Sequence, residues 1–345
     1  MLKTYLGIDV GSVSTNLVAL DSQLNVLESV YIRTMGHPVK ATQQGFRDLL
    51  SRLPRFEVMG VGATGSGRNL VAAMMGADEV KNEITAHAIG ASHFHPDVRT
   101  VFEIGGQDSK LILLRDGVVV DFAMNTVCAA GTGSFLDQQA LRLNIPIEDF
   151  GHWATMARQP VRIAGRCGVF AESDMIHKQQ MGYPTEEIIA GLCEALARNY
   201  LNNLGKGKEI QPPVVFQGGV AANLGLKRAF EKMLNIEIKV PQHYNVMGAI
   251  GAALLAAESM KGRKSAFRGA NFVLEGEFET RSMECDGCPN QCEVVSIHRQ
   301  GQVLAYFGDR CRRWDNSLKS SKVISREMKR TGYQTVPGTL ERASR

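Results

Sequence analysis

Short apolar runs that end in glycine-rich turns dominate the first 260 residues of the chain. Residues 4–10 predict a buried strand, and the runs at 16–20 and 26–33, separated by a polar turn, predict an antiparallel meander beside it. A strand–turn–strand opening is not the strand–turn–helix unit of a dinucleotide-binding fold. The same patterning predicts strands at 56–62, 100–104, 110–115, 117–122, 213–216 and 236–240, and helices at 40–53, 134–143, 186–204, 222–234 and 246–259.

This order of strands and helices predicts an α/β protein of two halves, 1–125 and 126–259, each with a strand that ends in a glycine-rich turn. Residues 260–280 are expected to form a charged linker, 281–315 a small cysteine-rich hairpin unit, and 316–345 a polar tail. The chain has 345 residues, 44% of them hydrophobic, which is enough to build about two packed cores.

The overall charge of the chain is mild and by itself excludes few classes of partner. The net charge is +4, and the lysines and arginines become more frequent only after Lys261, as on a solvated surface, so nucleic acid is not an expected partner. The longest apolar stretch, 247–257, is too short to span a membrane, and no signal peptide is visible. We therefore expect a cytoplasmic protein, in which the seven cysteines are metal ligands or core thiols and not disulfides.

Three glycine turns carry the chemistry: residues 7–15 (GIDVGSVST), 103–110 (EIGGQDSK) and 216–223 (FQGGVAAN). Glycine lets the backbone approach a phosphate, and hydroxyl and amide groups donate to phosphate oxygens. A single turn of this kind is usually an ordinary tight turn. The residues expected to bind ATP or ADP are Gly11, Ser12, Ser14, Thr15, Gly105, Gly106, Gly131, Gly133, Gly218, Gly219 and Asn223. The residues expected to act in catalysis, or to hold a hydrated Mg²⁺, are Asp9, Gln107 and Asp108.

Taken together, the three turns resemble the two phosphate motifs and the adenosine motif of the sugar kinase, actin and Hsp70 superfamily. Residues 241–253 are similar to its second connecting helix, so the resemblance covers nearly all of 4–256. It implies two RNase H-like subdomains around a nucleotide cleft, followed here by the cysteine-rich unit. A rival P-loop at 62–69 has Arg68 and Asn69 in place of the lysine and the Ser/Thr, so we reject it.

Two cysteines, Cys128 and Cys167, stand near expected helix starts, where free amides favour a thiolate. From composition alone, buried core cysteines would be the more ordinary interpretation. Their surroundings, however, closely resemble the activators (archerases) of 2-hydroxyacyl-CoA dehydratases, the ATPase subunits of benzoyl-CoA reductase and the activators of double-cubane-cluster proteins, all in the BadF-BadG-BcrA-BcrD ATPase family. In that family the matching cysteines bind a [4Fe–4S] cluster. A cubane needs four thiolates, so the resemblance implies a homodimer with one cluster per dimer.

The resemblance also implies a function. The chain would use ATP binding and hydrolysis to drive electrons from reduced ferredoxin or flavodoxin, through the cluster, to a partner iron–sulfur dehydratase or reductase. Two alternatives stay open: a small-molecule kinase of the same fold, and a nucleotide-gated regulatory protein. The kinase leaves Cys128, Cys167 and the four cysteines near the C-terminus unexplained, and a brown colour of the anaerobically purified protein would separate both alternatives from the activator.

The cysteine-rich unit contains Cys285, Cys288, Cys292 and, after an expected hairpin, Cys311. Four thiols at the two ends of a hairpin suit Zn²⁺ or a [4Fe–4S] cluster, and we expect one such second metal centre per chain. The cluster is favoured because structural zinc more often uses two C-x-x-C pairs. Cys193 lies in an apolar helical pattern and is expected in the core.

Overall fold

The computed structural model describes residues 2–53, 55–125 and 127–315. The chain divides after Leu274 into two compact units. The α/β class predicted from the sequence is confirmed, and the expected polar tail, 316–345, lies outside the described residues.

The first sheet of the N-terminal unit has the spatial order β3-β2-β1-β4-β5. Its strands are β1 (Leu2–Val10), β2 (Ser14–Leu20), β3 (Val26–Arg33), β4 (Phe56–Thr64) and β5 (Glu79–Val80). The predicted meander of β1, β2 and β3 is antiparallel, whereas β4 runs parallel to β1. The polar turn at 21–25 keeps β2 and β3 adjacent, because the Asp21 carboxylate accepts hydrogen bonds from the backbone amides of Gln23 and Asn25.

The second sheet repeats this topology, with the order β10-β9-β6-β7-β8. Its strands are β6 (Thr100–Ile104), β7 (Ser109–Arg115), β8 (Val118–Asn125), β9 (Val214–Gln217) and β10 (Ile238–Lys239). Again a three-strand antiparallel meander comes first, and the next strand, β9, runs parallel to the first one, β6. The second sheet thus begins at Thr100, before the division that we predicted at 125/126.

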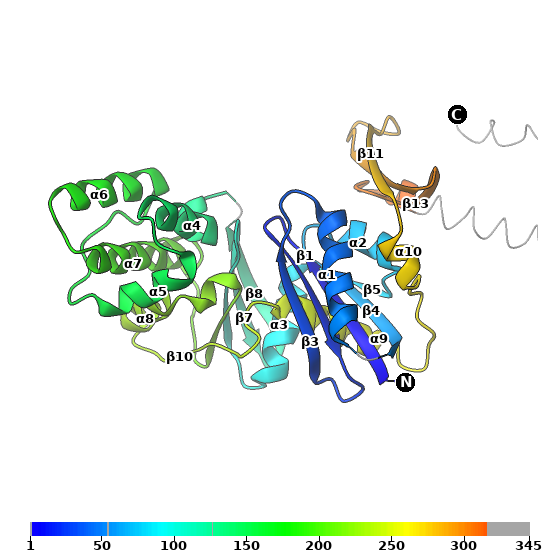
Figure 1. Cartoon of the computed structure of the whole chain (residues 1–345), viewed down its shortest axis with the longest axis horizontal. Coiled ribbons are helices and arrows are strands. Elements are labelled where there is room, and N and C mark those ends of the chain that lie inside the picture. Colours follow the sequence, from blue (N-terminus) through cyan, green and yellow to red (C-terminus); the bar gives the residue numbers. More distant parts are fainter. Residues whose placement is uncertain (1, 54, 126, 316–345) are drawn as a thin grey trace, which may run out of the picture. The chain divides into compact units, whose positions relative to one another are not determined.

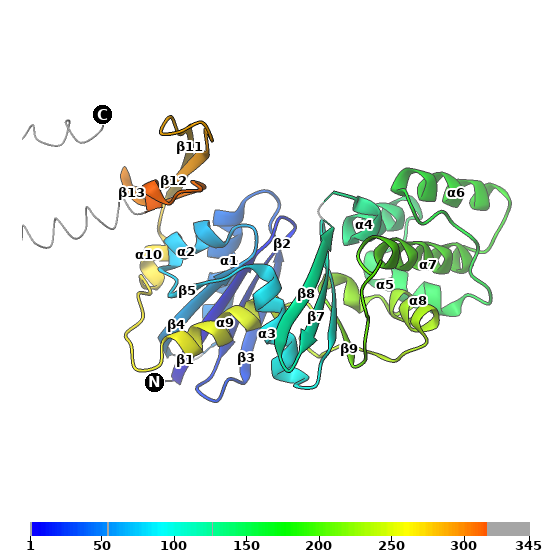
Figure 2. The same ribbon diagram turned by 180° about the vertical axis from the view of Figure 1, so that it is seen from behind.

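The helices form layers on and between the two sheets (Figure 1, and from behind in Figure 2). One face of the first sheet is covered by α1 (Pro38–Arg52), α2 (Arg68–Met75) and α10 (Ala270–Leu274). Between the sheets lie α3 (Glu83–Phe94) and α9 (Met247–Ser259). The outer face of the second sheet packs against α4 (Gly133–Arg142), α5 (Ile147–Met156), α6 (Gly168–Gln180), α7 (Thr185–Asn203) and α8 (Leu224–Leu234). Two short 3₁₀ helices, η1 (Ala129–Gly131) and η2 (Gly219–Ala222), lead into α4 and α8.

Small residues let α9 approach both the first sheet and α3 at backbone distance. A Cβ added at Gly62 would lie 1.9 Å from the carbonyl oxygen of Ala252, and one at Gly251 would lie 1.8 Å from that of Ala86. No larger residue fits at either position without moving α9. Small residues thus hold α9 directly against β4 and α3.

Helices α2, α3, α5, α6 and the short α10 were not predicted from the sequence, and α10 lies within 260–280, where a charged linker was expected. Helix α3 is packed between two sheets and is apolar on several sides, so it has no clear amphipathic period. Helix α6 buries only Ala171 and Met175, so its apolar stripe is too thin to stand out. None of the helices in the described ranges is long and apolar enough to cross a bilayer.

The C-terminal unit begins at Glu275 and contains an antiparallel sheet of order β11-β12-β13. Its strands are β11 (Phe278–Glu284), β12 (Glu293–Arg299) and β13 (Gln302–Phe307). The expected hairpin between the third and fourth cysteines is formed by β12 and β13. From Glu275 to Asp315 the buried apolar side chains are those of Cys285, Val294 and Ile297, a very small core for a folded unit.

Candidate functional site

The three glycine turns meet in a cleft of about 310 Å³ in the N-terminal unit. They follow β1, β6 and β9, so the site is built from strand ends of both sheets. Gly106 lies against Val13 so tightly that an added Cβ would approach its side chain to 2.6 Å. Of the residues predicted to act on a nucleotide, this cleft is lined by Asp9, Gly11, Ser12, Ser14, Gly105, Gly106, Gln107, Asp108, Gly218 and Gly219.

A second cavity of about 230 Å³ opens beside the first. Gly133 and Asn223, also predicted to bind nucleotide, line it. The Asn223 side chain accepts a hydrogen bond from Leu226 N at 2.9 Å and so caps α8. The two cavities share walls and therefore form one groove; the shared residues are Val13, Tyr31, Gly105, Gly106, Gly219 and Asn245.

Two of the predicted nucleotide residues lie outside this groove. Thr15 is buried, and its hydroxyl is 3.0 Å from that of Thr34, so the side chain braces β2 against the chain after β3. Gly131 packs against Asn199, whose Oδ1 would be 2.9 Å from an added Cβ. Its small size matters for the packing of η1 on α7.

A buried lysine organises the charges of the cleft. The ammonium of Lys110 lies 2.7 Å from Asp108 Oδ1, 2.8 Å from Glu83 Oε2 and 2.9 Å from Glu103 Oε2. Burial works to lower the pKa of Lys110, but the three carboxylates outweigh it and raise that pKa well above the ordinary value. The lysine is therefore charged and holds α3, β6 and β7 together at the site.

Asp9 lies at the end of β1, beside this cluster. Its burial, reinforced by the charge of Glu83, raises its pKa from 3.8 to about 7. Burial likewise raises the pKa of Glu103 to about 7. In the cleft, a divalent cation would therefore find carboxylate ligands whose negative charge is unfavourable as long as no cation is bound. A further acceptor, Asn16 Oδ1, is buried there with no hydrogen-bond partner among the described residues.

His87 of α3 faces Asp9 from the layer between the sheets. Its Nε2 is 4.0 Å from Asp9 Oδ2, and its Nδ1 is 3.0 Å from Gln217 Nε2. Burial lowers the pKa of His87 to about 3, so the imidazole is neutral. Because the Gln217 amide donates, Nδ1 accepts and Nε2 carries the proton that is directed toward Asp9.

Sequence reasoning missed Lys110, Glu83, Glu103 and His87. The sequence did contain a signal for Lys110 and Glu103, because both are ionisable residues within the apolar strands 100–104 and 110–115. Such residues are rarely buried unless they pair with other charges, so the pair could have been predicted to interact. Glu83 and His87 lie on α3, which was not predicted, so nothing in the sequence brought them to the cleft.

The cysteines Cys128 and Cys167 occupy the N-cap positions of η1 and α6, and both are partly exposed. The two helix starts are neighbours, because a Cβ at Gly168 would lie 3.7 Å from that of Ala130. Neither N-cap has a side-chain hydrogen bond, so the first-turn amides stay available. In contrast, Cys193 is buried in α7, as predicted, and burial raises the pKa of its thiol to about 12.

Two asparagines fix the loops that carry these cysteines. Asn125 accepts from Cys128 N at 3.0 Å and donates to Cys128 O at 2.8 Å. Asn199 donates to Gly165 O at 2.8 Å, two residues before Cys167. The segment after Cys128 is also tied to the nucleotide cleft: Gly133 N donates to Gly105 O at 2.9 Å, and Ser134 N to Gly106 O at 2.8 Å.

Two sheets of one repeated topology, with three glycine turns around a shared cleft, define an ATPase of the actin, Hsp70 and sugar-kinase type. More narrowly, the chain belongs to the BadF/BadG/BcrA/BcrD ATPase family, whose sequence profile matches residues 6–256. The resemblance inferred from the sequence is confirmed.

Several proteins of established name are similar to this chain. The (R)-2-hydroxyglutaryl-CoA dehydratase activating ATPase of Acidaminococcus fermentans is 35% identical over 253 residues, which is 73% of this chain and 96% of that protein. A subunit of the benzoyl-CoA reductase of Thauera aromatica is 28% identical over 265 residues, 73% of this chain and 92% of that one. The solved structure of the activator of the 2-hydroxyisocaproyl-CoA dehydratase from Clostridium difficile with bound ADPNP has a TM-score of 0.70 at 33% identity, and covers 75% of this chain and 96% of that one.

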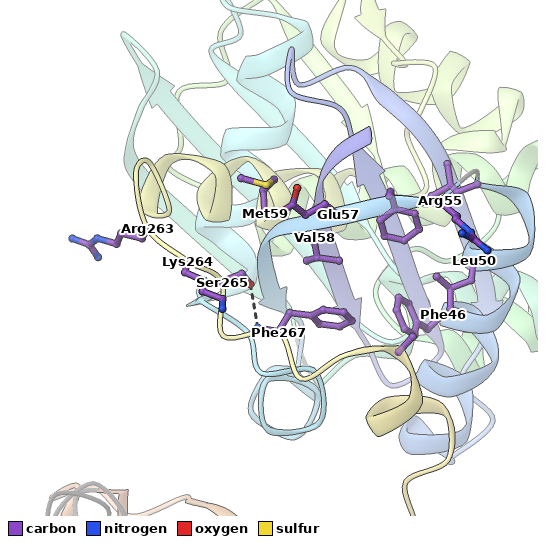
Figure 3. Close-up of a pocket in the computed structure, with 13 residues that line it drawn as sticks. Phe46, Leu50, Arg55, Glu57, Val58, Met59, Arg263, Lys264, Ser265 and Phe267 are labelled. Atoms are coloured by element: carbon purple, nitrogen blue, oxygen red, sulfur yellow. Dashed lines mark hydrogen bonds between the residues drawn. The ribbon is translucent and has the colours of Figure 1, made fainter. Parts of the chain in front are cut away.

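A larger cavity, of about 920 Å³, lies elsewhere in the N-terminal unit (Figure 3). Phe46, Val58 and Phe267 form its apolar wall, and Arg55 and Lys264 also line it. It contains none of the glycine turns, and the wall from Arg263 to Ala270 lies beyond residue 256, where the family match ends. The glycine turns that are expected to bind the nucleotide thus line the smaller groove and not this cavity.

Proposed function

We propose that this chain is a cytoplasmic, ATP-driven electron-transfer activator. It would accept electrons from reduced ferredoxin or flavodoxin and deliver them to a partner iron–sulfur dehydratase or reductase. Membership of the ATPase family supports the ATP-dependent part of this proposal. The relatives named as activators of acyl-CoA dehydratases, and the relative from benzoyl-CoA reductase, support the class of partner.

The observation that carries the proposal is the backbone link between the groove and the cysteine loop. Gly105 and Gly106, which line the groove, accept hydrogen bonds from Gly133 and Ser134 at the start of α4. The Ser134 hydroxyl donates a third hydrogen bond across this link, to Gly106 O at 2.6 Å. Since Cys128 precedes Gly133 by only five residues, a shift of this turn on binding a γ-phosphate would be passed directly to the cysteine.

In the groove we assign the hydrated Mg²⁺ to the carboxylates of Asp9 and Asp108, and the orientation of the attacking water to Gln107. The glycine amides of the three turns would hold the phosphates and the adenosine, and Gly133 and Asn223 would line the nucleoside end. Burial of Asp9 supports this assignment, because a cation next to it would offset the cost of its charge.

The residues at the second site suit an iron–sulfur cluster. Cys128 and Cys167 are partly exposed at neighbouring helix starts, and a cubane takes four thiolates, so two copies of the chain would share one cluster. Around these thiols, Val127, Val169 and Phe170 are large apolar side chains exposed by 94%, 71% and 66%. A homodimer would bury them. A [4Fe–4S] cluster bound there would supply one-electron redox chemistry.

Replacing Cys128 or Cys167 by serine tests the assignment. We expect each variant, purified without oxygen, to lose about two irons per chain, to dissociate toward monomer in sedimentation, and to lose electron transfer while still binding nucleotide. Cys193→Ala is the matched control, because that thiol is buried away from the surface and should leave iron content unchanged. Full iron and full electron transfer in both serine variants would refute the cluster assignment.

A further inference from the structure

The C-terminal unit brings four cysteines to one end of its small sheet. Cys285 follows β11 and Cys292 precedes β12, and their backbones pair directly, with Cys285 N donating to Cys292 O at 2.9 Å. Cys288 lies in the connection between them, where Gln291 N closes a turn by donating to Cys288 O. Three of the four cysteines thus belong to one hairpin end.

The fourth cysteine returns to the same end. Because β13 pairs with β12 from Gln302–Arg299 to Phe307–Val295, the chain leaves β13 beside the start of β12. Gly308 confirms this, since a Cβ there would lie 2.4 Å from Glu293 O. Cys311 follows three residues later, in a turn held by Asp309, whose carboxylate accepts a hydrogen bond from Trp314 N at 3.0 Å.

One side chain after Cys311 contacts another cysteine, and a second lies beside the turn that carries the cysteines. The indole N–H of Trp314 donates to Cys285 Sγ at 3.3 Å. The Arg313 guanidinium lies beside the same turn, 2.5 Å from where a Cβ of Gly287 would be. A positive charge and an N–H donor next to sulfur are what stabilise anionic metal thiolates.

We propose that Cys285, Cys288, Cys292 and Cys311 bind one metal centre through four thiolates, with Trp314 and Arg313 as its supporting donors. The four thiols lose their protons on binding, and the ligand is a thiophilic centre, either Zn²⁺ or a [4Fe–4S] cluster. As the described residues stand, no three His, Cys, Asp or Glu side chains are close enough to hold a metal ion. The exposed thiols of Cys288 and Cys311 must therefore close on Cys285 and Cys292.

The size of the unit explains why it needs a metal. Between Glu275 and Asp315 the buried apolar side chains are Val294, Ile297 and Cys285, and β11 is almost entirely exposed. Units of about 40 residues seldom bury enough apolar surface to fold without a staple. Since the family match ends at residue 256, this centre would be an addition to the shared ATPase and does not depend on the function proposed above.

The test uses the full chain with Cys128→Ser and Cys167→Ser already present, so that the other cysteine site contributes no metal. From anaerobic preparations we expect either about one zinc without sulfide, or about four irons with four sulfides, per chain. Either result supports the site and identifies its occupant. Adding Cys288→Ser or Cys311→Ser should remove the metal, whereas Cys193→Ala should retain it.

Trp314→Phe separates a metal site from mere packing. The phenyl ring keeps the contact with Tyr306, whose ring centroid is 5.2 Å away, but lacks the N–H donor to Cys285. We expect metal to be lost to a chelator about 10-fold more readily. Absence of metal from the folded chain, with all four thiols open to alkylation or paired as disulfides, would overturn the proposal, and so would metal retention in both serine variants.

Discussion

Asp9→Asn should stabilise the empty protein while it destroys its activity. The aspartate is 8% exposed and faces Glu83 and Glu103 across the cleft, so its negative charge is held at a cost until a cation arrives. Asparagine has nearly the same shape and no charge. The substitution therefore removes the electrostatic cost and leaves the packing almost unchanged.

The size of the effect follows from the pKa. The carboxyl titrates at about 7 in the folded chain, against 3.8 when unfolded, so the folded state binds the extra proton between these values. Stability of the parent then falls as the pH rises from about 4 to about 7, by roughly 4 kcal/mol. Asp9→Asn is free of this loss. Its advantage should be about 4 kcal/mol at pH 8, about half of that at pH 5.5, and absent near pH 4.

Thermal unfolding with EDTA present measures this difference. At about 2–4 °C per kcal/mol, the variant should melt roughly 10 °C above the parent at pH 8, and by about half as much at pH 5.5. Its Mg²⁺-dependent ATPase rate should fall by more than about tenfold. Asp21→Asn is the control with the opposite sign. Desolvation works to raise the pKa of Asp21, but the hydrogen bonds from Asn25 and Gln23 together outweigh it and lower that pKa, so loss of this carboxylate should destabilise the fold.

A melting temperature at pH 8 that is equal to or below that of the parent would refute the account of Asp9 as a strained carboxylate. So would a gain of the same size at both pH values, because that gain would come from packing and not from ionisation. Unchanged ATPase turnover would refute its role at the metal.

Two further predictions concern the groove and its support. Mg²⁺-nucleotide affinity should fall about tenfold between pH 8 and pH 6, because Asp9, with a pKa of about 7, must lose its proton before it can face the cation. Calorimetry should compare the parent with Asp9→Asn, because the titration of the nucleotide itself is the same for both proteins. An equal change of affinity with pH in the two proteins would contradict the assignment. Gly62→Ala should lower the free energy of unfolding in urea by about 3 kcal/mol or more, because its Cβ would lie 1.9 Å from the backbone of α9. Gly60→Ala in the same strand is the control. Its Cβ would meet the side chains of Met260 and Tyr5 at 3.2 Å, so the loss should be less than about 1 kcal/mol. Similar costs for the two variants would show that α9 is not seated as described.

The glycine turns could be predicted from the sequence because each follows a short apolar strand directly. Where a strand ends in Gly-Gly, as at Gly105 and Gly218, the backbone position is set locally, and the order of the turns then indicates the superfamily. The same holds for the meander of β1 to β3, whose period and polar turn are local features. Cys193 could be assigned to the core because its helix is apolar around it.

The charge cluster could not be predicted in this way, because its members come from elements whose pairing is tertiary. Lys110 of β7 meets Glu83 of α3 only because α3 packs between the sheets, and α3 carries no amphipathic period that would have indicated a helix. Thr15 was expected at the nucleotide but lies outside the groove, for a related reason. A hydroxyl in a phosphate-type turn looks available, but the alternation of β2 turns it inward, toward Thr34.

In the function proposed above, the second half of the ATPase would report on the nucleotide to Cys128, because the segment that carries this cysteine is hydrogen-bonded to the groove there. In the first sheet the end of β1 is braced by the turn before α2, where Gly67 N donates to Val10 O at 2.8 Å. In the second sheet the turn after β6 is braced instead by Gly133 and Ser134, and Cys128 lies on the same short segment. Both turns line the groove, through Gly11 and Gly105. Under the proposed function, a ligand that drew the two turns together would move α2 in the first half and the Cys128 loop in the second. The two halves therefore differ in the brace: in the first half it follows β4, whereas in the second it follows the meander directly and includes the segment after Cys128.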